Sequence, residues 1–280
     1  MVKEKLNSLI AAKKSMLCIG LDPDLEKIPP LFLKMSDPVA TFNRAVIEAT
    51  HQFAVAYKPN FAFYESRGAA GLGELERTLE FIPETCITIA DAKRADIGNT
   101  SKHYATAFFE IWKFDCVTVP PYMGYDSISP FLSYSDKLTF ILCLTSNSGS
   151  QDFEEAKLEN GQRLYERVLE KAVEWNKSGN VGVVVGATKP EQLAELRKAA
   201  PGLVFLIPGV GAQGGDLRAA VRNGIDANGG SALINLSRAI LYDPAQKSAS
   251  GIAVNDLDTF KSRVAVAAEQ TVTEMRTHLP

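Results

Sequence analysis

The chain has 280 residues, of which 46% are hydrophobic and 22% are charged, the composition of an ordinary globular protein with a sizeable core. Its formal net charge of −3 speaks against broad binding to nucleic acid, although one local positive site could still hold a small phosphorylated ligand. No stretch approaches the roughly 18 apolar residues of a membrane span, and the N-terminus lacks the apolar core of a secretory signal. We therefore expect no nucleic-acid partner and no membrane partner.

The cysteines indicate a reducing compartment. They are widely spaced, without a C-x-x-C pair, and each lies in an apolar run typical of a strand. A reduced, buried cysteine acts in such a run as a small hydrophobic residue. We expect no disulfide framework and a cytoplasmic location for this chain. The cysteines are Cys18, Cys86, Cys116 and Cys143.

Short β-rich runs recur along the chain and predict a parallel sheet. Each run is close to continuously apolar rather than alternating, and strands that are covered on both faces have this pattern. In chain order the predicted strands span 16–21, 53–58, 86–93, 115–120, 138–145, 181–186, 203–209 and 232–236.

The segments between these runs are long enough for crossover helices, for example 37–51, 191–200 and 215–224. Such alternation fits a closed (β/α)₈ barrel, also called a TIM barrel, or a large doubly wound sheet. We favour the barrel because no G-x-G-x-x-G follows the first strand and because polar residues follow many strands. We expect one domain over 1–280, with an N-terminal amphipathic helix across the barrel bottom. The long connection around 147–178 is either a lid or a solvated insertion.

The third predicted strand ends in the charged segment D-A-K-R-A-D-I-G-N-T. Because alternate residues of a strand share a face, Asp91 and Lys93 should both point into the barrel, where unpaired charges are costly. Lys58 ends the second strand and Asp22 follows the first, at the same rim. A structural ion pair between Asp91 and Lys93 is the plainer alternative. Two lysines and two carboxylates after three adjacent strands favour a catalytic site instead.

Two further polar residues of this segment, Asp96 and Thr100, lie four apart on one side of the first turn of the next expected helix. They need not face Asp91 and Lys93, and a loop of this kind could project into the site of a neighbouring subunit. The plainer alternative is that Asp96 is an ordinary helix cap.

Glycine-rich sequence follows the seventh predicted strand, in P-G-V-G-A-Q-G-G, and S-R follows the eighth. Glycine lets backbone N–H groups approach an anion closely, and the loops after the last two strands form the phosphate site of many barrels. Arg238 adds a planar group with a permanent positive charge. We therefore expect this end of the barrel to bind a phosphate.

Together these segments resemble one family. D-A-K-R-A-D-I-G-N-T resembles the D-x-K-x-x-D-I-x-x-T motif of orotidine 5′-phosphate decarboxylases. The resemblance extends over about positions 20 to 238, through the segments G-L-D-P, Y-K-P-N, T-S-N-S-G, P-G-V-G-A-Q-G and S-R. K-P-N-F-A-F-Y-E and L-T-S-N-S-G are similar to the longer bacterial branch. The resemblance implies a homodimer that converts orotidine 5′-phosphate to UMP and CO₂ in de novo pyrimidine biosynthesis, with no metal and no cofactor.

The resemblance also implies roles for individual residues. Lys58, Asp91 and Lys93 would come from one chain and Asp96 from the other, with Lys93 stabilising and protonating the C6 carbanion. Asp22 from the first chain and Thr100 from the second would hold ribose hydroxyls. The other substrate-binding positions are Ser146 against the pyrimidine, Gln213 and Arg238 on the phosphate, and Gly209, Gly211 and Ser237 in the same loops.

Two other functions compete with this interpretation. One is a Mg²⁺-dependent decarboxylase or lyase that acts on a sugar phosphate, with the same barrel and the same D-x-K-x-x-D. Lys58, with no obvious carboxylate in its place, favours the metal-free reaction, and His51, His103 and His278 form no ligand cluster. The other is a non-catalytic phosphate-binding or nucleotide-binding barrel. Such a protein would be expected to lack one of the four charged residues, but all four are present here: Lys58, Asp91, Lys93 and Asp96.

Overall fold

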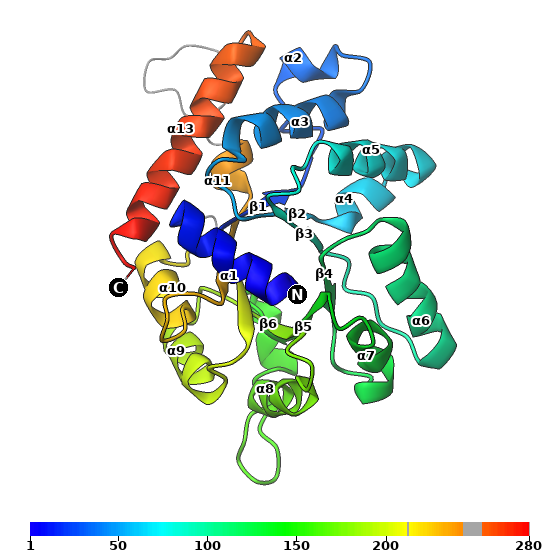
Figure 1. Ribbon diagram of the computed structural model, residues 1–280, viewed down its shortest axis with the longest axis vertical. Helices are drawn as coiled ribbons and strands as arrows, with labels where there is room; N and C mark the ends of the chain where they lie inside the picture. The colour runs from blue at the N-terminus through cyan, green and yellow to red at the C-terminus, as the bar shows by residue number, and fades with distance from the viewer. Residues whose placement is uncertain (212, 243–253, 280) are drawn as a thin grey trace.

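Parallel strands close into a barrel in the order β1-β2-β3-β4-β5-β6-β7-β8, and β8 pairs with β1 (Figure 1). The computed structural model describes residues 1–211, 213–242 and 254–279. Every predicted run overlaps one of these strands, and their closed order confirms the predicted barrel. The strands are β1 Leu17–Leu21, β2 Ala56–Pro59, β3 Ile87–Ala90, β4 Cys116–Val119, β5 Leu138–Leu144, β6 Val181–Val185, β7 Val204–Pro208 and β8 Ala232–Leu236.

Helices surround the barrel and explain why the strand runs are apolar throughout. All residues of β1, β2, β4, β6 and β8 are buried, because side chains on one face fill the barrel and those on the other pack under the helices. The helices are α1 Val2–Lys13, α2 Pro30–Leu33, α3 Pro38–Thr50, α4 Phe61–Glu65, α5 Gly68–Glu80, α6 Gly98–Thr106, α7 Tyr125–Leu132, α8 Leu164–Trp175, α9 Pro190–Ala199, α10 Leu217–Gly224, α11 Arg238–Leu241 and α13 Leu257–Arg276, with a π-helical turn η1 at Ala107–Ile111 and a 3₁₀ turn η2 at Ser148–Asp152.

Two of the helices predicted from the sequence, α3 and α10, begin at side-chain caps. The side chain of Asp37 accepts a hydrogen bond from the backbone N–H of Ala40, and Pro38 occupies the first turn of α3. Asp216 caps α10 in the same way, through the N–H of Ala219. These caps satisfy backbone donors that the first helical turn leaves without partners.

Helix α1 lies across the end of the barrel where the strands begin (Figure 1). The Lys5 ammonium donates to the carbonyl of Cys86, 3.1 Å away, just before β3. The side-chain oxygen of Asn7 accepts from the N–H of Ser231, 3.0 Å away, just before β8. These contacts close the bottom of the barrel and leave the opposite end open for a site.

A buried arginine also stabilises the bottom of the barrel. The Arg197 guanidinium donates to the carbonyls of Gly224, Leu203 and Ser231 at 2.8, 2.8 and 3.0 Å, and lies 3.7 Å from the ring centroid of Phe205. Burial lowers the pKa of Arg197 to about 10. Its partners are carbonyl oxygens and a ring face, which makes this a structural rather than a chemical centre.

The long connection between β5 and β6 spans 145–180 and contains α8, the regular barrel helix of this unit. What remains, 148–163, starts at η2 and is anchored by Glu154, which accepts from the N–H of Thr145 at 2.7 Å. Its outer part, around the isolated bridge between Lys157 and Arg163, extends away from the barrel beside α8 (Figure 1). This outer part is mostly exposed and matches a solvated insertion.

All four cysteines are buried and free, as expected from their apolar surroundings. Burial raises the pKa of the Cys18 thiol to about 12, so this thiol stays protonated inside the barrel. Across the described ranges, no helix combines the length and the hydropathy needed to cross a bilayer.

Candidate active site

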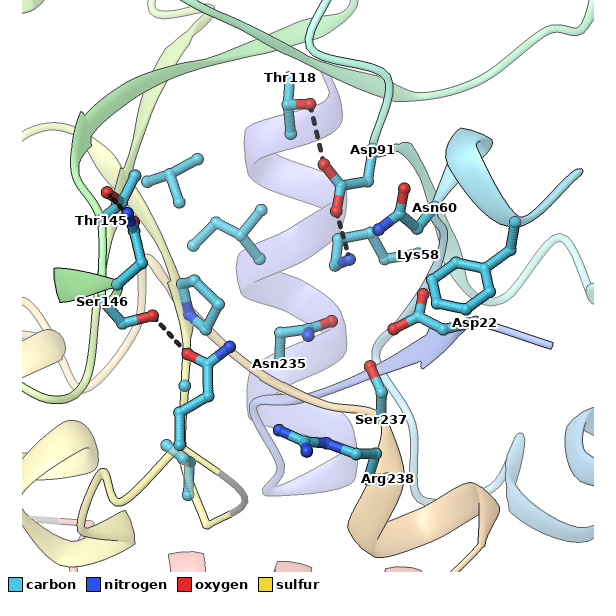
Figure 2. Close-up of a pocket in the computed structure, with 18 of the residues that line it drawn as sticks. Asp22, Lys58, Asn60, Asp91, Thr118, Thr145, Ser146, Asn235, Ser237 and Arg238 are labelled. Atoms are coloured by element: carbon cyan, nitrogen blue, oxygen red, sulfur yellow. Dashed lines mark hydrogen bonds and ion pairs between the residues drawn. The ribbon is translucent and has the colours of Figure 1, made fainter. Parts of the chain in front are cut away.

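A cavity of about 400 Å³ opens where the strands end, opposite α1 (Figure 2). Active sites of such barrels lie at this end, because the loops that follow the strands meet there. The residues singled out in the sequence that line this cavity are Asp22, Lys58, Asp91, Lys93, Ser146, Gly209, Gln213, Ser237 and Arg238.

A carboxylate between two ammonium groups forms the charged centre of the cavity. Asp91 Oδ2 lies 2.7 Å from the Nζ of Lys58, in a pair whose side chains are only 12% and 6% exposed. Asp91 Oδ1 pairs with the ammonium of Lys93. Burial opposes the ionisation of Asp91, but the two ammonium groups outweigh it and hold its pKa well below the usual range. Burial likewise opposes the charge of Lys58, and the carboxylates of Asp91 and Asp22 outweigh it and raise its pKa.

The structure differs from the sequence prediction in how Lys93 reaches Asp91. Strand β3 ends at Ala90, so Asp91 and Lys93 do not meet through strand alternation. Instead Lys93 adopts a left-handed backbone, with φ of 49°, which costs a non-glycine residue about 1–2 kcal/mol. This turn brings the half-exposed Lys93 ammonium back over the Asp91 carboxylate.

Thr118, on β4, is a site residue that the sequence analysis missed. Figure 2 shows its hydroxyl beside Asp91, and Oγ1 donates to Asp91 Oδ1 at 3.2 Å. The same oxygen accepts from the backbone N–H groups of Ala92, at 3.2 Å, and Lys93, at 3.1 Å. The available signal was a threonine within the otherwise apolar run C-V-T-V.

Two asparagines that the sequence analysis also passed over lie in the cavity wall (Figure 2). Asn60 caps the short helix α4 through the N–H of Ala62 and forms an isolated parallel bridge with Asp91. Asn235, on β8, is buried, and its side-chain oxygen accepts from the thiol of Cys18 at 3.5 Å. Both asparagines supply amide donors and acceptors near the charged centre.

The Asp22 carboxylate points into the same cavity (Figure 2). Its Oδ1 is buried and has no hydrogen-bond partner among the described residues, which indicates a ligand donor at this position. The Tyr242 hydroxyl fixes the backbone here, because it donates to the carbonyl of Asp22 at 2.6 Å and accepts from the N–H of Asp24 at 2.7 Å. Tyr242 was likewise not predicted.

The loops after β5 and β7 meet at the other side of the cavity. Ser146 donates a hydrogen bond from its hydroxyl to the side-chain oxygen of Gln213. Gly209 lies against both, since a Cβ there would be 2.8 Å from Gln213 Oε1 and 3.1 Å from Ser146 Oγ, and its φ of 97° also favours glycine. Arg238, the first residue of α11, lies on the cavity wall across from them (Figure 2).

The remaining glycine of the predicted phosphate loop is used differently. Gly211 is not among the residues that line the cavity, and its backbone N–H donates to the carbonyl of Gly215 at 2.9 Å. Its φ of 72° makes it a turn residue of the loop that carries Gln213. In this structure Gly211 therefore shapes the loop rather than contributing an N–H group to the cavity.

Asp96 and Thr100 are not part of the cavity that their own chain forms. Helix α6 begins at Gly98, so Asp96 precedes the helix and does not share its first turn with Thr100. Asp96 is half-buried and accepts from the N–H of Ile97 at 2.7 Å, whereas Thr100 is exposed. The neighbouring Ile97 is 56% exposed, an unusual position for a large apolar side chain.

The polar groups of the cavity suit an anionic substrate. Ammonium groups, a guanidinium, hydroxyls and amides converge from both sides, and apolar residues such as Leu142 and Val184 line the wall between them. Among the described residues, no group of three or more His, Cys, Asp or Glu side chains is arranged to hold a metal ion. The arrangement can bind a negatively charged ligand and stabilise negative charge that develops near Lys93.

Comparison with known proteins gives a consistent result. The sequence model of the orotidine 5′-phosphate decarboxylase / HUMPS family matches residues 15–251. The chain is 47% identical over 274 residues to orotidine 5′-phosphate decarboxylase of Christiangramia forsetii, covering 96% of this chain and 100% of that protein. It is 54% identical over 242 residues to that of Dehalococcoides mccartyi, covering 85% and 88%.

Solved structures agree with these sequence matches. The structure of Leishmania donovani OMP decarboxylase superposes with a TM-score of 0.81 at 37% identity and covers 98% of both chains. Leishmania donovani UMP synthase gives a TM-score of 0.84 at 39% identity and covers 98% of this chain and 56% of that one.

Proposed function

The chain belongs to the orotidine 5′-phosphate decarboxylase family, and we propose that it converts orotidine 5′-phosphate to UMP and CO₂ in de novo pyrimidine biosynthesis, without a metal or cofactor. The observation that carries the proposal is the Asp91 carboxylate held between the ammonium groups of Lys58 and Lys93, in a cavity that also contains Arg238. This arrangement supplies a fixed positive charge and a proton donor at one point, which is what the reaction requires.

The chemical step breaks the bond between C6 and the carboxylate carbon of the substrate. Loss of CO₂ leaves the electron pair on C6 in an sp² orbital that the pyrimidine ring delocalises poorly. The ammonium of Lys93 stabilises this pair and then donates a proton to C6, which completes UMP. Asp91 lies next to the departing carboxylate, and the repulsion between the two is relieved as CO₂ leaves. Lys58 keeps Asp91 ionised and in place.

The rest of the cavity binds the parts of the substrate that do not react. Asp22, whose buried Oδ1 has no hydrogen-bond partner among the described residues, accepts a hydrogen bond from a ribose hydroxyl. Ser146 contacts the pyrimidine, and Gln213 and Arg238 bind the phosphate, with Gly209 and Ser237 beside them. Binding energy gained at the phosphate is available to close and align the site around C6.

The active form in this proposal is a homodimer with shared sites. Asp96 and Thr100 lie outside the cavity of their own chain, which fits residues that complete the site of a neighbour. In the dimer, the partner subunit's Asp96 extends the alternating row that Lys58, Asp91 and Lys93 begin, and the partner subunit's Thr100 binds ribose. The buried free cysteines are in keeping with a cytoplasmic location.

The first test is the fall in ultraviolet absorbance when purified protein is added to orotidine 5′-phosphate in excess EDTA. We expect rapid conversion to UMP at a rate that added Mg²⁺ does not change. Absence of conversion by folded protein would overturn the proposed reaction, and conversion that requires Mg²⁺ would overturn its metal independence.

A second test addresses the shared site. Lys93→Ala and Asp96→Asn proteins, each with little activity alone, are mixed under conditions that let subunits exchange. Each hybrid dimer then contains one site with neither substitution, so random exchange restores about a quarter of wild-type activity. Mixing Lys93→Ala with Lys58→Ala is the matched control, because every site of that hybrid keeps one substitution. Equal recovery in both mixtures, or none in the first, contradicts the shared site.

A further inference from the structure

One hydroxyl group, that of Thr118, contacts both the Asp91 carboxylate and the backbone turn at Lys93. Thr118 Oγ1 donates to Asp91 Oδ1 at 3.2 Å and accepts from the backbone N–H groups of Ala92 and Lys93 at 3.2 and 3.1 Å. A hydroxyl has one proton to donate and two lone pairs to accept, so these three contacts use its full capacity. Thr118 is 1% exposed, so its hydroxyl makes these three contacts away from bulk solvent.

The Thr118 hydroxyl lies where the backbone pairing between β3 and β4 ends. The last paired residues are Ala90 on β3 and Val117 on β4, in parallel register, so Asp91 and Thr118 would form the next pair. Beyond this point the chain leaves the strand and enters the left-handed turn at Lys93. The Thr118 side chain therefore provides the acceptor that the sheet no longer offers to the two N–H groups of the turn.

We propose that Thr118 is a positioning residue that sets both the Asp91 carboxylate and the turn that aims Lys93 at the substrate. This inference rests on the proposed decarboxylation, in which Lys93 must lie within hydrogen-bond reach of C6. Because the branched side chain of a threonine in a strand has restricted rotation, its oxygen is held in one direction. The turn is therefore hydrogen-bonded to an atom whose position is fixed by the barrel. Thr118 does not take part in the chemical step itself.

The test is the substitution Thr118→Val, which keeps the shape of the side chain and removes the hydroxyl. We expect kcat to fall about 100-fold, the effect of misplacing a reacting group by about 1 Å, while the dissociation constant of UMP changes less than about threefold. Thr118→Ser, which restores the hydroxyl, should recover kcat to within about fivefold of wild type. If the valine protein does not fold, Thr118→Cys replaces it, because a thiol is a weak hydrogen-bond donor and acceptor. We expect the same result from it, a large fall in kcat with little change in the dissociation constant of UMP.

Thr139→Val on the adjacent strand is the matched control. Thr139 is also 1% exposed and pairs in register with Val117, but its hydroxyl has no hydrogen-bond partner among the described residues. We expect wild-type kcat from this variant. A kcat for Thr118→Val within about threefold of wild type overturns the inference, as does a serine variant that is as slow as the valine one.

A crystal structure of Thr118→Val separates failure of the inference from failure of the proposed function. We expect Asp91 to rotate or the φ of Lys93 to leave the left-handed region. If the wild-type protein does not decarboxylate orotidine 5′-phosphate, the proposed function fails, and the same crystal structure still decides whether the hydroxyl holds the turn. An unchanged Asp91 and an unchanged Lys93 backbone overturn the positioning role.

Discussion

Replacing Asp91 by asparagine tests whether the charged centre is as tightly coupled as its geometry indicates. The carboxylate is 12% exposed and its partner Lys58 is 6% exposed, so Asp91→Asn leaves a buried ammonium without its nearest counter-charge. Removal of one partner from a buried ion pair lowers the free energy of unfolding by about 3–5 kcal/mol. We expect a loss of this size at neutral pH.

The dependence of this loss on pH follows from the two pKa shifts. The pKa of Asp91 is lower in the folded protein than the roughly 3.9 of the unfolded chain, so its contribution is complete above about pH 5, begins to fall below about pH 4 and is fully lost only below the folded pKa. The pKa of Lys58 is raised on folding, so its contribution is complete below about pH 10 and is lost only as the pH rises further. The difference between wild type and Asp91→Asn should therefore be constant between about pH 5 and neutral pH and shrink in acid, by at most about 1.4 kcal/mol per pH unit.

The assay is equilibrium unfolding in urea, followed by tryptophan fluorescence at a series of pH values. Asp136→Asn is the control, since Asp136 is exposed and lies at the barrel bottom near the start of α1. A loss below about 1 kcal/mol for Asp91→Asn refutes the reasoning, because the buried Lys58 would then not depend on Asp91. So does a difference that widens as the pH falls below about 5.

Three further substitutions separate chemistry, binding and stability. Lys93→Ala should abolish turnover of orotidine 5′-phosphate while UMP still binds within about tenfold of wild type, measured by calorimetry; measurable turnover would remove Lys93 as the proton donor. Arg238→Ala should weaken UMP binding about 10- to 100-fold and leave uridine binding unchanged, because a charged hydrogen bond contributes about 1.5–3 kcal/mol; equal effects on both ligands would place the phosphate elsewhere. Arg197→Met should lower the free energy of unfolding by about 3 kcal/mol in urea and leave kcat unchanged, since Arg197 lies at the opposite end of the barrel; a large fall in kcat would contradict this separation.

The sequence was sufficient to predict the fold. Each strand is an apolar run of the expected length, and a parallel barrel buries both faces of its strands, so local composition and tertiary environment agree. The prediction was wrong at the end of the third strand, which was expected to run to Lys93 and stops at Ala90. The sequence could not show this end, because it depends on a hydroxyl of β4 that lies far along the chain.

The charged site residues that follow strands could be predicted from the sequence. The uncharged polar site residues that lie within strands could not. Lys58 and Asp91 could be singled out because such side chains are costly inside a barrel without a partner. Arg238 could be singled out because it follows the last strand, near the glycine-rich loop of a predicted phosphate site. Thr118 and Asn235 are uncharged and lie in apolar runs, so their importance depends on which strand is the neighbour and in what register. Pairing information of this kind becomes available only when the barrel is closed.

The left-handed backbone of Lys93 has a consequence for attempts to improve this protein by directed evolution. Asparagine and glycine adopt that conformation more readily than lysine, so Lys93→Asn or Lys93→Gly relieves roughly 1 kcal/mol of backbone strain. Either change also removes the ion pair with Asp91, so a screen that rewards heat resistance alone accepts it where the relief of backbone strain is the larger effect, and the proton donor is then lost. Stability and activity are opposed at this one residue, and a useful screen must therefore also demand growth without external pyrimidine.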